Sequence, residues 1–536
     1  MVIRCAGNEN SVRKHILANR IMLYDYLILG AGPAGLQLGY YLERAGYGYR
    51  ILERGDSAGT FFKQFPRHRT LISINKVYTG CNDPERNMRW DWNSLLTDDY
   101  GFLFKDYSKE YFPGADAMVD YLRGFAAKYV PSIRYDTDII RISRDKEGFH
   151  AETTTGETFS GRRIIIATGV GKPWSPAIPG IEMAEQYSSV SIDSLDFADQ
   201  RVLILGKGNS SFETADHLTG HAATIHVAGP ELLKFAWQTH YVGHLRAINN
   251  NFIDTYLLKS QNGILDATVE KIEREGNGFR ATVIYHRAGG SRSSYYYDRV
   301  ICCTGFQIDE NIFGKGCQPE MDPETDNRFP RQNAVWESTN IPDMYFAGTL
   351  TQQRDFKKTT SGFIHGFRYN ARALFHYLAH EYHDAPWPHD DIQRREIAPA
   401  IIRLINRNSA LWQQFGFLGD VFLLESEAGA AHYEAVPLDY IHDGGLVGDK
   451  PYFTVTLEYG HQEFDTLYDD RVSEHDADNA ADSSALHPII RLCRKGEVLA
   501  EQHLVENLEA IWEDPQLHIE PLDQFIGSID LSGASA

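Results

Sequence analysis

Cysteine is scarce in this sequence. Its 536 residues include six cysteines, and none of the usual C-x-x-C or C-x-x-x-x-C spacings of a redox-active dithiol occurs. Six cysteines are too few for a disulfide framework in a chain of this length. Cys302 and Cys303 are adjacent on an expected strand, where neighbouring side chains point to opposite faces, so we expect packing cysteines. Cys81 is a lone thiol, and a structural role is favoured for it over a redox role.

Excess positive charge and long apolar runs are also missing. The formal net charge of −21 speaks against nucleic-acid binding and against docking on anionic membranes. No apolar run approaches the roughly 18 residues of a membrane span, and the first residues lack the apolar core of a signal peptide. We therefore expect a cytoplasmic protein with no nucleic-acid and no membrane partner, and we assign no metal ligands.

A glycine turn near the N-terminus is the strongest positive signal. An apolar strand over residues 26–29 runs into Gly30-Ala-Gly-Pro-Ala-Gly35, an amphipathic helix follows, and a second strand ends at Glu53. In a dinucleotide site, Gly30 makes the tight turn, Gly32 lets a pyrophosphate approach and Gly35 lets helix and strand pack closely. Glu53 stands where an acid accepts from a ribose hydroxyl. The order of these parts predicts a dinucleotide-binding βαβ unit.

The same pattern returns in the middle of the chain. Residues 203–206 repeat residues 27–30 identically, and Ser211 replaces the third glycine. The next strand, over residues 224–227, ends without an acid. A second dinucleotide site with a different ligand preference is the direct inference. Neither an acid nor an arginine follows Val227 at once, so NADPH and NADH both stay open.

Two such sites, the first ending in an acid, are typical of a flavoprotein that is reduced by a nicotinamide. We predict an α/β fold with two Rossmann-like dinucleotide-binding domains, the NAD(P) domain inserted in the FAD domain, and a C-terminal α+β extension. In the extension we expect a helix over residues 392–415, broken at Pro399, and strands over 451–459 and 484–506. An acidic run over 463–478 is expected to be a solvated loop. The domains are predicted as residues 1–25 (a polar leader), 26–170 with 300–385 (FAD), 171–299 (NAD(P)H) and 386–536 (the extension).

The predicted cofactor residues lie in the two glycine turns and at the ends of the strands around them. The FAD residues are Gly30, Gly32, Pro33, Ala34, Gly35, Glu53, Arg54, Thr60, Phe61, Arg69, Asn75, Ile139, Thr168, Gly169, Gly348 and Thr349. The NAD(P)H residues are Gly206, Gly208, Asn209, Ser210, Ser211, Glu213, Thr304 and Gly305.

The acceptor of the electrons is the open question. The segment Leu71-Ile-Ser-Ile-Asn75-Lys76 resembles the asparagine-containing segment of flavin-containing monooxygenases, although their F-x-G-x-x-x-H fingerprint appears here as Tyr187-Ser-Ser-Val-Ser-Ile-Asp193, without the glycine and histidine. Asn75, Lys76 and His240 are the candidate catalytic residues, and His365 is a further candidate on the helix expected near the flavin. The predicted substrate pocket consists of Trp237, His240, Tyr241 and Arg246.

A closer resemblance covers nearly the whole chain. The sequence resembles the FAD-dependent oxidoreductase domain-containing protein 2 family at several segments, and the resemblance implies binding of FAD and NAD(P)H. These segments are Pro66-Arg-His-Arg, Asp91-Trp-Asn-Ser-Leu-Leu, Tyr111-Phe-Pro, Trp237-Gln-Thr-His-Tyr-Val-Gly, Arg246-Ala-Ile-Asn-Asn and Gly362-Phe-Ile-His-Gly-Phe-Arg-Tyr369.

The leading hypothesis is a flavin monooxygenase-like enzyme that oxidises NAD(P)H, forms a C4a-(hydro)peroxyflavin and oxygenates a small molecule, with dioxygen as co-substrate. One alternative is an NAD(P)H-dependent reductase of a disulfide or quinone. Another is a flavin-bearing protein-interaction module. Assembly into a homo-oligomer is left open.

Overall fold

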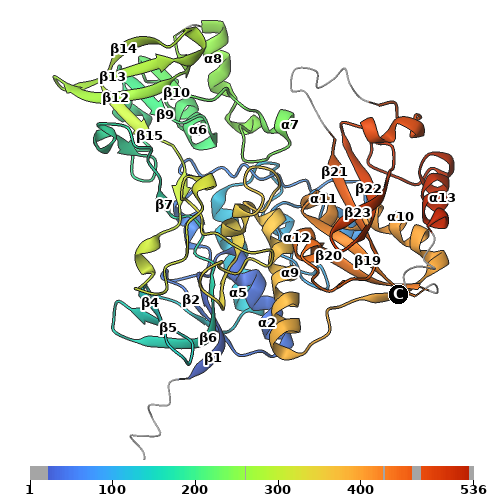
Figure 1. Ribbon diagram of the computed structural model, residues 1–536. Coiled ribbons are helices and arrows are strands. Elements are labelled where there is room, and N and C mark those ends of the chain that lie inside the picture. The colour runs from blue at the N-terminus through green and yellow to red at the C-terminus, as the bar shows by residue number, and fades with distance from the viewer. Residues whose placement is uncertain (1–21, 260, 427–428, 461–471, 530–536) are drawn as a thin grey trace, which may run out of the picture.

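The computed structural model describes residues 22–259, 261–426, 429–460 and 472–529. In this part of the chain, three large sheets organise the fold, of seven, five and six strands. Figure 1 shows the seven-stranded sheet at the bottom, the five-stranded sheet at the upper left and the six-stranded sheet at the right. The strands of the five-stranded sheet lie in the sequence between the first strands of the seven-stranded sheet and its last strand, residues 344–346, and the two glycine turns follow strands of these two sheets.

The seven-stranded sheet is built around β1, which pairs in parallel with β2 and β6. Because side chains alternate along a strand, Tyr26 and Ile28 pack against the helices α2, α5 and α9, while Leu27 and Leu29 join the core on the opposite face. Strands β4, β5 and β6 pair antiparallel in sequence order and form a meander. The elements are β1 (Leu23–Leu29), α2 (Pro33–Ala45), β2 (Tyr49–Leu52), α3 (Thr60–Gln64), α4 (Pro84–Asn87), α5 (Ala115–Tyr129), β3 (Ile133–Arg134), β4 (Ile139–Arg144), β5 (Phe149–Thr153), β6 (Thr158–Ile166), β17 (Met344–Phe346) and α9 (Ile364–His383).

The five-stranded sheet is parallel throughout, in the order β11-β10-β9-β15-β8, and the antiparallel sheet β12-β13-β14 packs against it. All of β15 pairs with β9, so we place the return to the first sheet after residue 302 and not at 300. The chain crosses between the sheets at the antiparallel pair β7 and β16. The elements are β7 (Lys172–Pro173), β8 (Glu185–Gln186), β9 (Arg201–Leu205), α6 (Asn209–Leu218), β10 (Thr224–Gly229), α7 (Ala236–Thr239), α8 (Asn251–Lys259), β11 (Gly263–Asp266), β12 (Thr268–Glu275), β13 (Gly278–Tyr285), β14 (Ser291–Tyr297), β15 (Arg299–Cys302) and β16 (Phe306–Gln307).

The C-terminal extension differs from the prediction in its first half. The expected helix over 392–415 is wrong at its start, because residues 390–393 form strand β18. Helix α10 begins two residues before Pro399. Proline is tolerated in the first turn of a helix, where its missing N–H would have no partner within the helix. The strands β19 and β20 were not expected, whereas the expected strands β21, β22 and β23 are confirmed. Most of the acidic run over 463–478 lies outside the described residues. The elements are β18 (Asp390–Gln393), α10 (Ile397–Arg407), α11 (Ser409–Gln413), β19 (Leu418–Ser426), β20 (Gly429–Pro437), α12 (Leu438–His442), β21 (Tyr452–Tyr459), β22 (Leu486–Arg494), β23 (Glu497–His503) and α13 (Glu520–Ser528).

Buried hydrogen bonds join the extension to helix α4 and the residues that follow it. The guanidinium of Arg89, which is 1% exposed, donates to the carbonyl of Ile405 at 2.6 Å. The backbone N–H of Ser409 donates to the Glu85 carboxylate at 2.7 Å. Bonds from buried charged groups are stronger than neutral ones, and unmaking them would leave a charge unpaired. The extension therefore packs as one body with the sheet that carries the first glycine turn.

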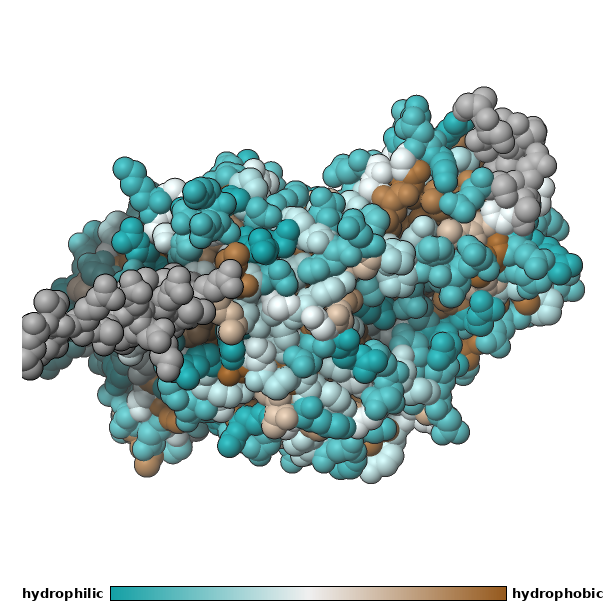
Figure 2. Space-filling model, turned by 90° about the horizontal axis from the view of Figure 1, so that it is seen from below, coloured by the Kyte–Doolittle hydropathy of each residue, from teal (hydrophilic) through white to brown (hydrophobic). Residues whose placement is uncertain are grey.

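The surface is mostly polar. Figure 2 shows one face that is mostly hydrophilic, with small hydrophobic patches between the polar side chains. Among the residues described, no helix combines the length and the apolar character needed to cross a bilayer.

Candidate functional site

The first glycine turn, residues 30–35, has the geometry of a phosphate-binding turn. Gly30 has a φ of 104°, and a Cβ there would lie 2.7 Å from the carbonyl oxygen of Ala167. A Cβ on Gly35 would overlap the carbonyl oxygen of Gly30, so helix α2 packs closely on β1. Nothing lies within 4 Å of the Cβ position of Gly32, and no side chain caps the N-terminus of α2. The free N–H groups and the open space fit a pyrophosphate.

Glu53 stands at the end of β2, where the sequence predicts an acid for a ribose. Its side chain is buried, and its two oxygens accept from the N–H of Ala31 at 2.7 Å and of Gly55 at 2.9 Å. Each carboxylate oxygen keeps a further lone pair. The acid therefore holds the turn in place and still has acceptor capacity for a hydroxyl group.

The second glycine turn, residues 206–211, repeats this geometry. Gly206 has a φ of 107°, and a Cβ there would overlap the carbonyl oxygen of Cys303. The Cβ position of Gly208 is open, and α6 again begins without a side-chain cap. Ser211 replaces the third glycine and donates from its hydroxyl to the carbonyl of Cys303 at 3.4 Å. The donors of both turns thus suit the two dinucleotides that the sequence predicts.

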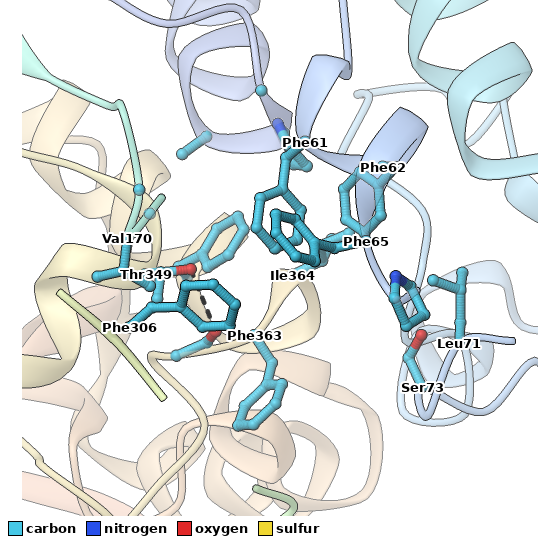
Figure 3. A pocket seen from close by; sticks show the side chains of 18 of the residues that line it. Phe61, Phe62, Phe65, Leu71, Ser73, Val170, Phe306, Thr349, Phe363 and Ile364 are labelled. Atoms are coloured by element: carbon cyan, nitrogen blue, oxygen red, sulfur yellow. Dashed lines mark hydrogen bonds between the residues drawn. The ribbon is translucent and has the colours of Figure 1, made fainter. Parts of the chain in front are cut away.

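A cavity of about 360 Å³ lies between the two turns. It is lined on one side by predicted FAD residues and on the other by predicted NAD(P)H residues, which it brings together. The hydroxyl of Thr349 donates to the carbonyl of Gly362 at 3.3 Å beside the N-terminus of α9 (Figure 3). The predicted residues among its lining are Gly32, Pro33, Ala34, Phe61, Thr168, Gly169, Gly348, Thr349, Asn209, Ser210 and Glu213.

Aromatic side chains that the sequence did not single out form much of the wall. The rings of Phe65 and Tyr187 stack with centroids 5.9 Å apart, and Phe306 meets Phe65 edge-on at 5.1 Å. Figure 3 shows Phe61, Phe65, Phe306 and Phe363 around the same space. These residues come from separate segments of the sequence, so no local motif indicates that they form one wall. The high aromatic content of the chain was the only sign of such a wall in the sequence. Such a wall offers apolar surroundings to whatever the cavity binds.

Glu213 is the ionisable group of this wall. Its carboxylate accepts from the hydroxyl of Tyr187, which in turn accepts from the backbone N–H of Arg67 at 3.0 Å. Burial raises the pKa of Glu213 to about 7, against lowering contributions from its hydrogen bonds. The cavity therefore contains an acid that changes charge near neutral pH.

Asn75 and Lys76 lie elsewhere. They line a separate pocket together with Cys81, and neither lines the cavity. The amide nitrogen of Asn75 donates to the carbonyls of Ser108 at 2.8 Å and Glu110 at 3.2 Å. Both donors of its amide group hold a loop, and the residue does not line the cavity, so this placement does not support the predicted catalytic role.

The four residues of the predicted substrate pocket do not all lie together. The ring of His240, the third catalytic candidate, stacks on Tyr459 of β21 with centroids 3.7 Å apart, and Trp237 is 52% exposed. Tyr241 packs against Phe363, a residue of the cavity wall, at 6.0 Å. Arg246 lies over the ring of Trp92, another wall residue, at 4.9 Å. Tyr241 and Arg246 therefore approach the cavity, while His240 contacts the C-terminal extension.

The other predicted residues support the turns or lie further off. Thr60 donates to the carbonyl of Ser57 at 3.1 Å, and Arg69 pairs with Asp116. Arg54 lies near Gly171, and Ile139 packs against the core under β1. Thr304 donates to the carbonyl of Trp174 at 2.6 Å, and Gly305 has a φ of 98° at the end of β15.

Comparisons with known proteins find relatives for most of this chain. The family model "Pyridine nucleotide-disulphide oxidoreductase" matches residues 27–348. FAD-dependent oxidoreductase domain-containing protein 2 of Mus musculus is 36% identical over 554 residues, which cover 94% of this chain and 83% of the mouse protein.

Solved structures share the fold of the two nucleotide-binding sheets. A flavin-containing monooxygenase from Stenotrophomonas maltophilia matches with a TM-score of 0.52 and 20% identity, over 67% of this chain and 99% of that one. The bacillithiol disulfide reductase of Staphylococcus aureus matches with a TM-score of 0.51 and 19% identity, over 67% and 100%. A monooxygenase and a disulfide reductase are thus equally similar in fold, so the activity has to be argued from the site.

Proposed function

The chain belongs to the pyridine nucleotide-disulphide oxidoreductases and, within them, to the FAD-dependent oxidoreductase domain-containing protein 2 family, and from this premise we propose that it is a monooxygenase-like enzyme. It is a flavoprotein oxidoreductase with FAD and NAD(P)H as its cofactors. When bound, the flavin takes a hydride from the nicotinamide and, once reduced, reacts with dioxygen. The proposal concerns the last acceptor, a small molecule that is oxygenated.

The observation that carries the proposal is the cavity between the two turns. The first turn and α2 offer N–H groups to the pyrophosphate of FAD, and the second turn and α6 offer the same to NAD(P)H. Phe65, Tyr187 and Phe306 enclose the space where both cofactors would meet. Oxygen transfer to a substrate requires that reduced flavin be shielded from water, and an apolar, aromatic wall favours such shielding once both cofactors are bound.

The thiols support the same proposal. A disulfide reductase needs a thiol beside the flavin, yet no cysteine is among the residues that line the cavity. The five cysteines that the structure describes are all free, and Cys303, which is buried, has a pKa raised far above its usual range by that burial. A neutral, buried thiol is a poor nucleophile.

A competition between acceptors tests the proposal. The purified flavoprotein is reduced with NADPH under argon, and we expect the visible absorbance of the flavin to bleach. Air-saturated buffer, a disulfide dye or a naphthoquinone is then mixed in separate experiments. Dioxygen should reoxidise the flavin, with oxygen uptake that matches the NADPH consumed. Reoxidation that is faster with the disulfide or the quinone than with dioxygen would contradict the proposal.

Replacing Cys81 by serine tests the alternative that the protein is a reductase that uses this thiol. Because Cys81 lies in the pocket of Asn75 and not in the cavity, we expect C81S to keep the wild-type rates of flavin reduction and of reoxidation by every acceptor. The measurement is the same stopped-flow series. A loss of disulfide reduction in C81S, with unchanged reduction of the flavin by NADPH, would favour a reductase.

A further inference from the structure

Arg246 reaches from the second glycine turn to the opposite wall of the cavity. Its backbone N–H donates to the side-chain oxygen of Asn209 at 3.0 Å, which fixes its Cα beside the start of α6. Its guanidinium extends to Trp92, and the Cζ atom lies 4.9 Å from the centre of that ring. Asn209 and Trp92 both line the cavity. The charge of Arg246 therefore lies against a residue of the cavity wall, Trp92.

The guanidinium continues a column of stacked rings. His365 stacks on Trp92 with centroids 4.4 Å apart, and Phe363 stacks on His365 at 5.8 Å. His365 is 1% exposed, and burial, together with Arg368 and Arg246, holds its pKa well below the usual range. Its ring is therefore neutral. The column formed by Phe363, His365, Trp92 and Arg246 has a single charge, at its Arg246 end.

Within the described residues, no acid balances this charge. The guanidinium of Arg246 makes neither an ion pair nor a hydrogen bond there, and burial lowers its pKa with no carboxylate to oppose the effect. Some half-buried arginines of this chain are paired with an acid, as Arg299 is with Glu185. Others donate to a backbone carbonyl, as Arg67 does to Val190 at 2.7 Å, whereas the guanidinium of Arg246 has neither kind of partner among the described residues. The chain has 73 acidic residues against 52 Lys and Arg, so counter-ions are abundant. Removing a cation from water without an anion is costly.

His365 adds an independent sign of a missing ligand. Neither ring nitrogen has a hydrogen-bond partner in the described part of the chain. Buried polar groups nearly always find a partner, and exceptions require an explanation. Trp92 lies between His365 and Arg246 in the column, so these are two separate polar groups without a partner, both in contact with a residue of the cavity wall. The uncompensated cation of Arg246 is explained by an anionic ligand.

We propose that Arg246 binds the carboxylate of the substrate, which is therefore an aromatic organic acid. The planar guanidinium matches a carboxylate with two parallel N–H donors, and Trp92 holds it from one face. Phe65, Phe306 and Phe363 offer apolar contacts to a planar ring. This inference rests on the proposed function, since it names the substrate class of the same cavity.

A phosphate of the nicotinamide cofactor is the competing anion. The phosphate-binding groups of the second turn are the open position at Gly208 and the first N–H groups of α6. The guanidinium of Arg246 leaves this turn and lies against Trp92, whose other neighbour, His365, belongs to α9. It thus faces the flavin side, where the substrate reacts.

The test uses three acids and their uncharged counterparts. The oxidised holoenzyme is titrated with benzoate, phenylacetate and indole-3-acetate, and with the three corresponding primary amides. Binding is followed by the perturbation of the flavin spectrum and by the shift in Tm. We expect at least one acid to bind about tenfold or more tightly than its amide, as for a charge-assisted pair. R246Q should abolish this preference, and R246K should retain part of it.

Controls keep the outcomes distinct. R287Q removes an exposed arginine of the turn between β13 and β14 and should leave the preference unchanged. Equal binding of acids and amides, no binding of any, or a preference that survives in R246Q would overturn the inference. So would a weaker affinity for NADPH in R246Q with acid binding intact, because Arg246 would then serve the cofactor. Failure of the wild type to be reduced by NADPH would refute the proposed function, while the titrations would still test the acid site.

Discussion

Replacing Gly35 by alanine is expected to yield a protein that purifies without flavin. The added Cβ would overlap the carbonyl oxygen of Gly30, which is backbone and has no rotamer to change. Helix α2 would have to move away from β1, and its free N–H groups would leave the phosphate position. Overpacking of this kind costs about 1–3 kcal/mol in stability, and a displaced turn should lower FAD affinity by roughly 100-fold or more. The ratio of flavin to protein absorbance after purification measures the effect.

Two matched variants show whether the effect is specific to the first turn. In G206A, the added Cβ would overlap the carbonyl oxygen of Cys303. This variant should keep its flavin and lose reduction by NADPH at ordinary concentrations. Gly220 is exposed and has open space around its Cβ position, so G220A should behave as the wild type. A full complement of flavin in G35A would contradict the assignment of the first turn to FAD.

The turns were predictable because they depend on neighbours in the sequence. Strand β1, Gly30, Gly35 and Glu53 lie within one βαβ unit, so their spacing determines their geometry almost alone. The repeat at Gly206 follows from the same local rules. These are the elements on which the sequence and the structure agree most closely.

The cavity wall could not be predicted in this way. Phe65, Tyr187 and Phe306 are each more than 100 residues apart in sequence, and their contact depends on how two sheets are placed. Asn75 misled for a related reason, since its segment resembles a flavin-facing one but its amide is taken up by Ser108 and Glu110. His240 could not be placed from the sequence because the ring on which it stacks, Tyr459, lies more than 200 residues away.

Strand β19 of the C-terminal extension could not be predicted from the hydrophobic pattern of the sequence. The run from Val421 to Leu424 is continuously apolar, because β19 lies inside its sheet and is buried on both faces. Such a run has no period of two, and its length does not separate strand from helix. Only pairing with β20 and β21, whose partners lie up to about 35 residues away, decides the outcome.

Flavin reduction is expected to accelerate as the pH rises through about 7, the pKa of Glu213. Below this value the buried side chain is a neutral acid, and above it a carboxylate that faces the cavity. An ionised Glu213 stabilises the positive charge that a nicotinamide acquires on losing its hydride. The effect should be roughly tenfold in rate, equivalent to about 1.4 kcal/mol. Stopped-flow reduction under argon, from about two pH units below this pKa to two above, measures it.

Two variants test whether Glu213 causes the increase in the rate of flavin reduction around pH 7. E213Q should abolish this increase and keep the rate at its low-pH value, whereas E231Q, at an exposed position beyond β10, should leave the increase unchanged. Y187F takes away the hydroxyl that donates to the carboxylate and lowers its pKa, so the step should move to higher pH. A step that persists in E213Q would assign the titration to another group.

Stability must change with the opposite sign. Because folding raises the pKa of Glu213 from 4.5 to about 7, the folded state binds this proton more tightly than the unfolded state does. The contribution of Glu213 to stability is thus fully present below pH 4.5 and is lost as the pH rises through 7. E213Q should therefore have a higher Tm than the wild type above pH 7, although it reduces its flavin more slowly. A variant that is more stable and slower identifies a buried charge kept for chemistry, and a merely structural acid would not combine the two effects.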